Sequence, residues 1–152
     1  MDVDGRFAPD SVGAARRRYA DLATTARQVV RETARAMEFD REEYRDRVDA
    51  DVVATARDAL FAAELEVRVG TREEFEDWRD SFDGDVHVAG NENVDNVAWH
   101  AFDGTAVAAT FQNEPEAAVA TLRRQAFGRL YREHLYESAD GASDTDAEVT
   151  EE

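Results

Sequence analysis

The sequence predicts an α+β fold, in which an N-terminal helical unit packs with a mainly antiparallel sheet of about four strands and a C-terminal helix. Three observations lead to this class. Apolar residues recur at steps of three and four in the first 65 residues, alternate with period two in short runs between residues 65 and 111, and return to the helical step afterwards. The chain has 152 residues, 43% of them apolar, which suits one ordinary domain with a core.

The helical unit is expected to begin at Ser11, an N-cap residue, after a disordered lead over residues 1–10. The inward face of this long helix is predicted to comprise Val12, Ala15, Tyr19, Leu22, Ala26, Val29, Thr33 and Met37. Asp40 and Glu43 form a capping box that starts a short second helix. A third helix runs to about Leu65, with Val52, Val53, Ala56, Leu60 and Ala63 facing inward.

The period then changes to that of strands. Residues 65–69 predict a half-buried strand, and a capping box at Thr71 and Glu74 opens a short helix. Strands are predicted around 86–88, over 97–102 and over 105–111, the last two joined by Asp103 and Gly104, residue types that favour a type I′ turn. Asn113 with Glu116 is expected to cap the final helix. Its inward face is predicted to comprise Val119, Leu122, Ala126, Leu130 and His134.

The domain is predicted to span residues 1–136. Residues 137–152 contain seven acids, no base and no aromatic residue. Such a segment buries too little apolar surface to order itself, so a disordered acidic tail is expected.

The acidic composition of the chain indicates a salt-rich environment. The formal net charge is −17, all 18 basic residues are Arg, and the chain has neither Lys nor Ile. Molar salt screens charge beyond about 3 Å, so a dense carboxylate surface costs little there and keeps the molecule hydrated. We therefore expect a haloarchaeal protein. The chain has no Cys, no apolar run long enough to span a membrane and no apolar leader, so a cytoplasmic location is expected.

His87 and His100 are the first candidate site. If the strands around 86–88 and 97–102 form a hairpin, a symmetric register places the two imidazoles opposite each other. They could then share a metal with Glu92 or Asp95. The alternative is two histidines at a sheet surface or a subunit contact, and no metal ligand is assigned.

The polar loop between these strands is the second candidate. Asn91, Glu92, Asn93 and Asp95 could grip a ligand or partner, since binding residues favour loops on rigid scaffolds. The alternative is a turn-rich connection, because Asn and Asp make local turns.

The three helices and the strand after them also suggest a winged-helix-like arrangement. Thr55 and Arg57 of the third helix would then face the bases of DNA. The net charge of −17 disfavours such binding, which needs a positive stripe.

The hairpin over 97–111 is apolar on both faces, so each face must be covered, either by helices of the same chain or by a second subunit. No phosphate loop, nucleophile elbow or zinc-protease motif occurs, and no cofactor is implied. The leading hypothesis is a non-enzymatic interaction or oligomerisation module, one form of which is a homodimer through the sheet or the first helix. A DNA-binding regulator and a metal-dependent enzyme remain alternatives.

The segments 51–62, 92–100 and 109–128 resemble a small haloarchaeal protein family of unknown function. The resemblance covers nearly all of residues 1–136. It implies lineage and compartment, and it brings no activity, cofactor or catalytic residue to any position of this chain.

Overall fold

The computed structural model describes residues 1–136, and the predicted acidic tail over 137–152 lies outside the described residues. The chain forms an α+β fold, as expected. The elements are β1 (Asp2–Asp4), α1 (Val12–Ala36), α2 (Arg41–Arg47), α3 (Ala50–Glu64), β2 (Val67–Thr71), α4 (Arg72–Asp80), β3 (Asp85–Ala89), β4 (Asn96–Phe102), β5 (Thr105–Phe111), α5 (Pro115–Ala126) and the π-helix η1 (Phe127–Tyr131). Residues 132–136 continue as helix.

The sheet is mixed and its strand order is β1-β2-β4-β5-β3. Strands β4 and β5 form the predicted hairpin, with Phe102 opposite Thr105. Asp103 and Gly104 have φ angles of 51° and 82°, the left-handed backbone that a type I′ turn requires at both positions. The sequence prediction of this turn is therefore confirmed.

The metal hypothesis required a hairpin between β3 and β4, and the structure does not have one. Strand β3 lies at the far edge of the sheet and pairs in parallel with β5, where His87 is opposite Val107. The chain between β3 and β4 therefore has to cross the end of β5. The predicted hairpin was wrong because the alternation of apolar and polar residues predicts a strand but does not indicate which strand it pairs with.

The N-terminal lead is ordered in the structure, contrary to expectation. Asp2–Asp4 adds strand β1 antiparallel to β2, which makes the sheet five-stranded. Phe7 exchanges backbone hydrogen bonds with the segment after α3, accepting from Glu66 N and donating to Glu64 O, and its ring meets Phe61 edge-on. Backbone pairing over this distance leaves no local sequence pattern.

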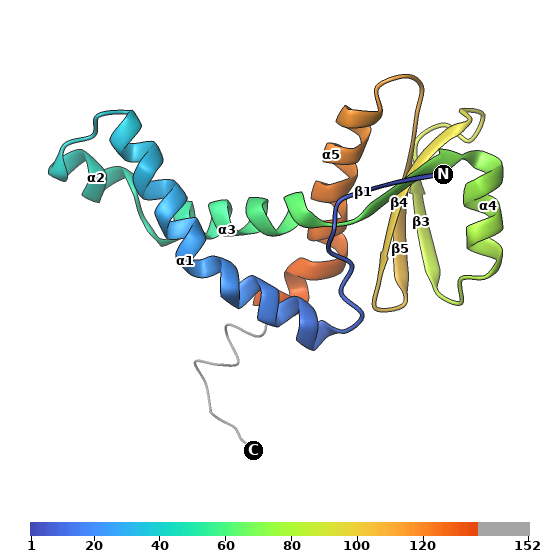
Figure 1. The fold of residues 1–152 in the computed structure, drawn as a ribbon, viewed down its shortest axis with the longest axis horizontal. Coiled ribbons are helices and arrows are strands. Elements are labelled where there is room, and N and C mark those ends of the chain that lie inside the picture. Colours follow the sequence, from blue (N-terminus) through green and yellow to red (C-terminus); the bar gives the residue numbers. More distant parts are fainter. Residues whose placement is uncertain (137–152) are drawn as a thin grey trace, which may run out of the picture.

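Helices of the same chain cover both faces of the sheet, with α5 on one face and α4 on the other (Figure 1). On the α5 face Ala98, Val107 and Leu122 belong to the main core. On the α4 face a smaller core contains Phe75, Val97, Trp99 and Ala108. Both faces of the hairpin are thus covered by helices of the same chain.

The N-terminal helices extend away from this body as a projection (Figure 1). Helix α1 runs outward, α3 packs along it on the way back, and α2 lies at the tip. We call residues 27–53 the arm. Within it α2 buries no side chain, whereas α1 buries Val30 and Ala34. A helix pair that projects in this way differs from the compact three-helix unit of a winged helix.

The buried face of α1 departs from the predicted one beyond Ala26. Val30 and Ala34 are buried instead of Val29 and Thr33, and Met37 follows the end of the helix. Val29 is 41% exposed and Met37 is 59% exposed. The outer part of α1 therefore leaves apolar side chains in solvent.

Helix ends confirm part of the capping prediction. Asp40 with Glu43 and Thr71 with Glu74 both form reciprocal capping boxes. The predicted cap at Asn113 was wrong, because α5 begins after Glu114 without a side-chain cap and with Pro115 in its first turn. Within the part of the chain that the structure describes, no helix combines the length and apolarity needed to cross a bilayer.

Candidate functional site

His100 is a core residue whose two ring nitrogens are both bonded. It is 4% exposed, its Nδ1 lies 2.6 Å from the carbonyl oxygen of Glu66, and its Nε2 lies 2.6 Å from the Tyr131 hydroxyl. Since a carbonyl only accepts, Nδ1 carries the proton and donates, and Nε2 accepts from Tyr131. Burial lowers the pKa of His100 below its usual range, against the opposing hydrogen bond to Glu66.

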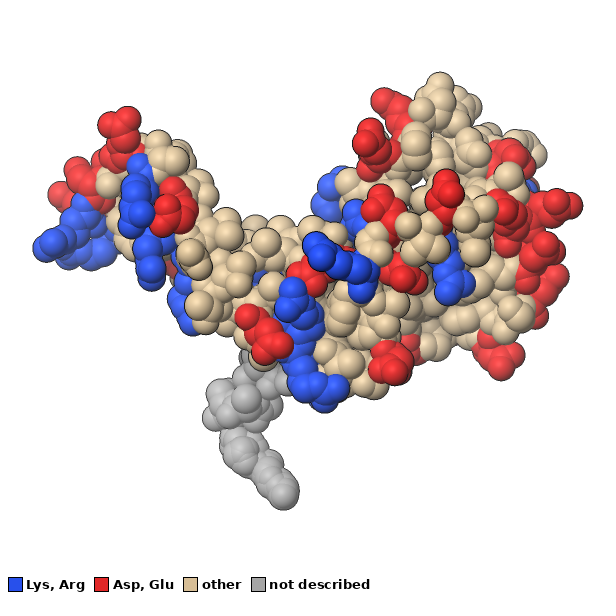
Figure 2. All heavy atoms as spheres, viewed as in Figure 1, with Lys and Arg blue, Asp and Glu red and all other residues tan. Residues whose placement is uncertain are grey.

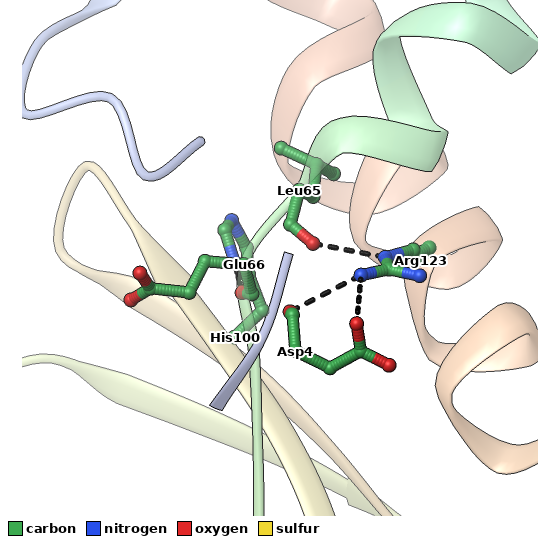
Figure 3. A network of polar contacts seen from close by, with 5 residues as sticks. All are labelled: Asp4, Leu65, Glu66, His100 and Arg123. Atoms are coloured by element: carbon green, nitrogen blue, oxygen red, sulfur yellow. Dashed lines mark hydrogen bonds and ion pairs between the residues drawn. The ribbon is translucent and has the colours of Figure 1, made fainter. Parts of the chain in front are cut away.

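A second polar network lies close to His100 (Figure 3). Arg123 of α5 donates from Nε to the Leu65 carbonyl at 2.9 Å and from Nη2 to the Asp4 carbonyl at 3.1 Å. The guanidinium thereby joins β1 and the start of β2 to α5. These contacts hold backbone together and leave no open ligand position on the Arg123 Nε.

His87 and His100 do not share a site. Val107 of β5 is paired with His87 on one side and with His100 on the other, so a whole strand separates them. His87 is exposed at the edge of the sheet. Across residues 1–136, no group of three or more His, Asp and Glu side chains is placed to hold a metal ion.

The loop predicted as a ligand grip is arranged as a turn. Asn91 Oδ1 accepts from Asn93 N at 2.8 Å, and Val94 N donates to the Asn91 carbonyl at 3.1 Å. Arg72 of α4 donates to the Val94 carbonyl from both Nε and Nη2. Glu92 and Asp95 are exposed. The structure thus brings Asn91 and Asn93 together through local bonds, and a binding role for the loop stays a prediction.

The two residues proposed to read DNA have other contacts. Arg57 donates from Nε to the Tyr19 carbonyl at 2.7 Å, and its guanidinium lies 3.9 Å from the centroid of the Tyr19 ring. Thr55 donates to the Asp51 carbonyl within its own helix. Arg57 is therefore engaged in the α1–α3 contact, and DNA binding by Thr55 and Arg57 stays a prediction.

A cavity lies at the base of the arm. It has a volume of about 470 Å³ and lies between α3 and the helix that follows η1. Its lining comprises Asp51, Ala54, Thr55, Asp58, Ala59, Ala62, Arg124, Phe127, Arg132 and Tyr136. The lining combines two acids, two arginines and the rings of Phe127 and Tyr136.

Asp58 connects three segments within this cavity. Its Oδ1 accepts from the Tyr19 hydroxyl at 2.7 Å, and its Oδ2 accepts from the Tyr136 hydroxyl at 2.6 Å. Burial and the hydrogen bond to Asp58 raise the pKa of both tyrosines, so both stay protonated and donate at neutral pH. With both oxygens bonded, Asp58 acts as a tie between α1, α3 and the C-terminal helix.

Arg132 packs against the aromatic wall of the same cavity. Its guanidinium lies 5.4 Å from the ring centroids of both Phe127 and Tyr136, within the range of cation–π attraction. Phe127 opens the π-helix η1, and such π-turns occur often at functional sites.

Of the residues that line this cavity, only Thr55 was a predicted site residue, as a base reader. Tyr19 was predicted on the inward face of the first helix, and Asp58 had no predicted role. The π-turn shifts the register of the last helix, so that Tyr131 and Leu135 are buried while His134 is 33% exposed and pairs with Asp103 at 3.5 Å. An apolar residue at each of positions 126, 127, 130, 131 and 135 was the available signal.

Comparisons with known proteins identify a family and bring no activity. The chain has no significant match among curated proteins or among solved structures. A family described as "Family of unknown function (DUF5809)" matches residues 6–132, which is most of the chain. The resemblance to a family of unknown function is thereby confirmed: the protein belongs to the DUF5809 family.

Proposed function

We propose that the protein is a non-enzymatic interaction module that associates with a second copy of itself through the arm. The observation that carries the proposal is the position of the exposed apolar side chains. Val29, Met37 and Val52, all on the arm, are 41%, 59% and 39% exposed. Single exposed apolar residues are ordinary, but three of them lie on one projection, where binding of a partner would bury them.

The weak packing of the arm supports the same conclusion. In α1 the arm buries only small side chains, Val30 and Ala34, and α2 buries none. Because most helical stability in proteins comes from packing of an apolar face, a projecting helix pair gains from a second layer. A second α1–α3 pair would supply that layer and complete a four-helix bundle.

Charge favours the arm over the body as the contact between two copies. The helical unit Val12–Glu64 carries ten Arg and 11 Asp and Glu, so it is close to neutral. Residues 72–102 carry two Arg and nine acids. A two-fold contact through the arm would join the near-neutral parts of two copies and keep the acidic parts apart. The sheet needs no second copy, because α4 and α5 cover its faces.

The mass of the protein in molar KCl tests the proposal. Light scattering after gel filtration should report a dimer for the parent and a monomer for a variant with Val29→Glu and Met37→Glu, because the two carboxylates would be buried unpaired in the contact. Val88→Glu is the matched control, since Val88 is 40% exposed but lies on β3, and it should remain a dimer.

Two results would contradict the proposal. One is that the parent protein is a monomer, like the arm variant, at every concentration at which the two are compared. The other is a dimer that survives both arm substitutions and is lost with Val88→Glu. Circular dichroism of each variant in the same salt shows whether its helices are retained.

A further inference from the structure

We propose that a pocket at the tip of the arm binds a mononucleotide, with guanidiniums on its phosphates and aromatic rings against its base. The pocket has a volume of about 340 Å³ and lies between the end of α1, the following turn and α2. Its lining comprises Arg31, Ala34, Arg35, Phe39, Asp40, Arg41, Tyr44 and Arg45. Figure 2 shows arginine side chains, with acidic ones beside them, at this end of the molecule.

The two walls of the pocket carry the same arrangement of arginines. Arg31 and Arg35 line it from α1, and Arg41 and Arg45 line it from α2. In each helix the two arginines are four residues apart and therefore lie on one face. Four arginines thus line one space from two helices, in a molecule whose formal net charge is −17.

Two of the three acids within α2 lie away from this face. With about 100° of rotation per residue, Glu43 and Asp46 point away from the direction that Arg41 and Arg45 share, and Glu42 lies beside it. Glu43 is also bonded to the backbone of Asp40 in the capping box, and the Asp40 carboxylate accepts from Glu43 N. The one acid in the lining is therefore already engaged at the start of the helix.

Most of the positive charge in the pocket lacks a partner within the chain. Arg35 pairs with Glu32 at 2.9 Å. Arg31, Arg41 and Arg45 form no ion pair with any of residues 1–136. Because like charges repel, an anion with several oxygens would stabilise the cluster. Phosphate fits best, since a guanidinium binds two of its oxygens at once.

The rings of Phe39 and Tyr44 favour a nucleotide over an inorganic anion. Every base has a π-face that stacks on an aromatic ring, and arginine adds to such stacking. Arg47 already lies 5.5 Å from the Phe39 ring centroid. A free nucleotide is favoured over a nucleic-acid strand, because the strand would bring its many phosphates against the acidic remainder of the molecule.

Calorimetry of the full chain in molar KCl tests this binding, separately from the mass measurement that tests self-association. Adenosine triphosphate is expected to bind to the parent, and a variant with Arg41→Ala and Arg45→Ala is expected to bind it at least about tenfold more weakly, since each lost guanidinium removes charge-assisted bonds. Arg17→Ala is the control, because Arg17 is exposed on α1 outside the pocket, and its affinity should equal that of the parent.

Two further titrants test the phosphate contacts and the base contacts separately. Inorganic triphosphate and adenosine should each bind more weakly than adenosine triphosphate. The proposal is overturned if adenosine triphosphate produces no heat with the folded parent, if Arg17→Ala weakens binding as much as the tip variant, or if inorganic triphosphate binds equally well. Tight binding of an oligonucleotide without binding of the free nucleotide would overturn the choice of ligand.

Discussion

His100 and Tyr131 form a buried polar pair that joins three segments of the fold. His100 stands on β4, its Nδ1 donates to the backbone just before β2, and its Nε2 accepts from the hydroxyl of η1. Burial raises the pKa of Tyr131, so its hydroxyl remains a donor. Each partner satisfies a group that would otherwise be buried without a hydrogen bond, which makes the pair sensitive to substitution.

Tyr131→Phe is expected to lower the free energy of unfolding by about 1–3 kcal/mol, because it leaves His100 Nε2 buried without a donor. Urea unfolding in constant molar KCl measures the change. Tyr44→Phe, which removes a hydroxyl that makes no hydrogen bond within residues 1–136, should leave the free energy of unfolding nearly unchanged. Equal losses in the two variants would contradict this account of Tyr131.

His100 also predicts a pH dependence of stability. Its pKa is lower in the folded protein than in the unfolded chain, so the unfolded chain takes up the proton first as the pH falls. The stability is therefore complete above about pH 6.5, the ordinary histidine pKa, and decreases below it. Thermal unfolding between about pH 5 and 7 measures this decrease, which should persist in His87→Gln and vanish in His100→Gln.

At the scale of the element, α1 shows how packing selects among apolar positions. The predicted face followed alternating steps of three and four, an average of about 3.5 residues per turn, whereas a straight helix has about 3.6 and drifts from such a face. Val30 and Ala34 therefore replace Val29 and Thr33 against α3. The sequence showed both sets as apolar or small, and only the path of α3 decided between them.

Helix α4 has a cap whose contribution can be isolated. Thr71 accepts from Glu74 N at 3.1 Å, and Glu74 Oε1 accepts from Thr71 N at 2.9 Å. Thr71→Ala should therefore cost about 1 kcal/mol of stability. The fluorescence of Trp78 and Trp99, which pack against Phe75 of this helix, reports its unfolding. Thr25→Ala, in the exposed middle of α1, should cost nothing; a similar loss there would contradict the assignment.

Local sequence signals predicted most helices and strands but few of the pairings between strands. The capping boxes at Asp40 and Thr71 and the turn at Asp103 were predicted, because each depends on residues within four positions of one another. The parallel pairing of β3 with β5 and the addition of β1 were not. Both depend on backbone bonds between distant segments, which leave no periodic pattern in the chain.

At the scale of the whole molecule, the charges are unevenly divided. The helical unit is near neutral, whereas residues 72–102 are strongly acidic (Figure 2). A purely solubilising role would not require this division. We expect the acidic surface of the body to be an adaptation to brine, and the arginines of the arm tip carry the proposed nucleotide binding.

Removal of salt is expected to unfold the protein. In dilute buffer the carboxylates of a chain with net charge −17 repel one another over a longer distance, which destabilises the compact state. Thermal melts followed by circular dichroism should show a lower midpoint in millimolar than in molar KCl. An equal concentration of sorbitol is the control for osmotic effects, and a midpoint that does not depend on KCl would contradict the halophilic interpretation.

The sequence by itself determined the fold class, the order of most elements and the character of the surface, because period, caps and composition are properties of neighbouring residues. Only the tertiary structure decided which faces are covered, that His100 is a bonded core residue, that Asp58 ties three helical segments, and that four arginines meet at the tip of the arm. Each of these depends on side chains brought together from separate elements, and their meeting is set by the packing of the whole chain.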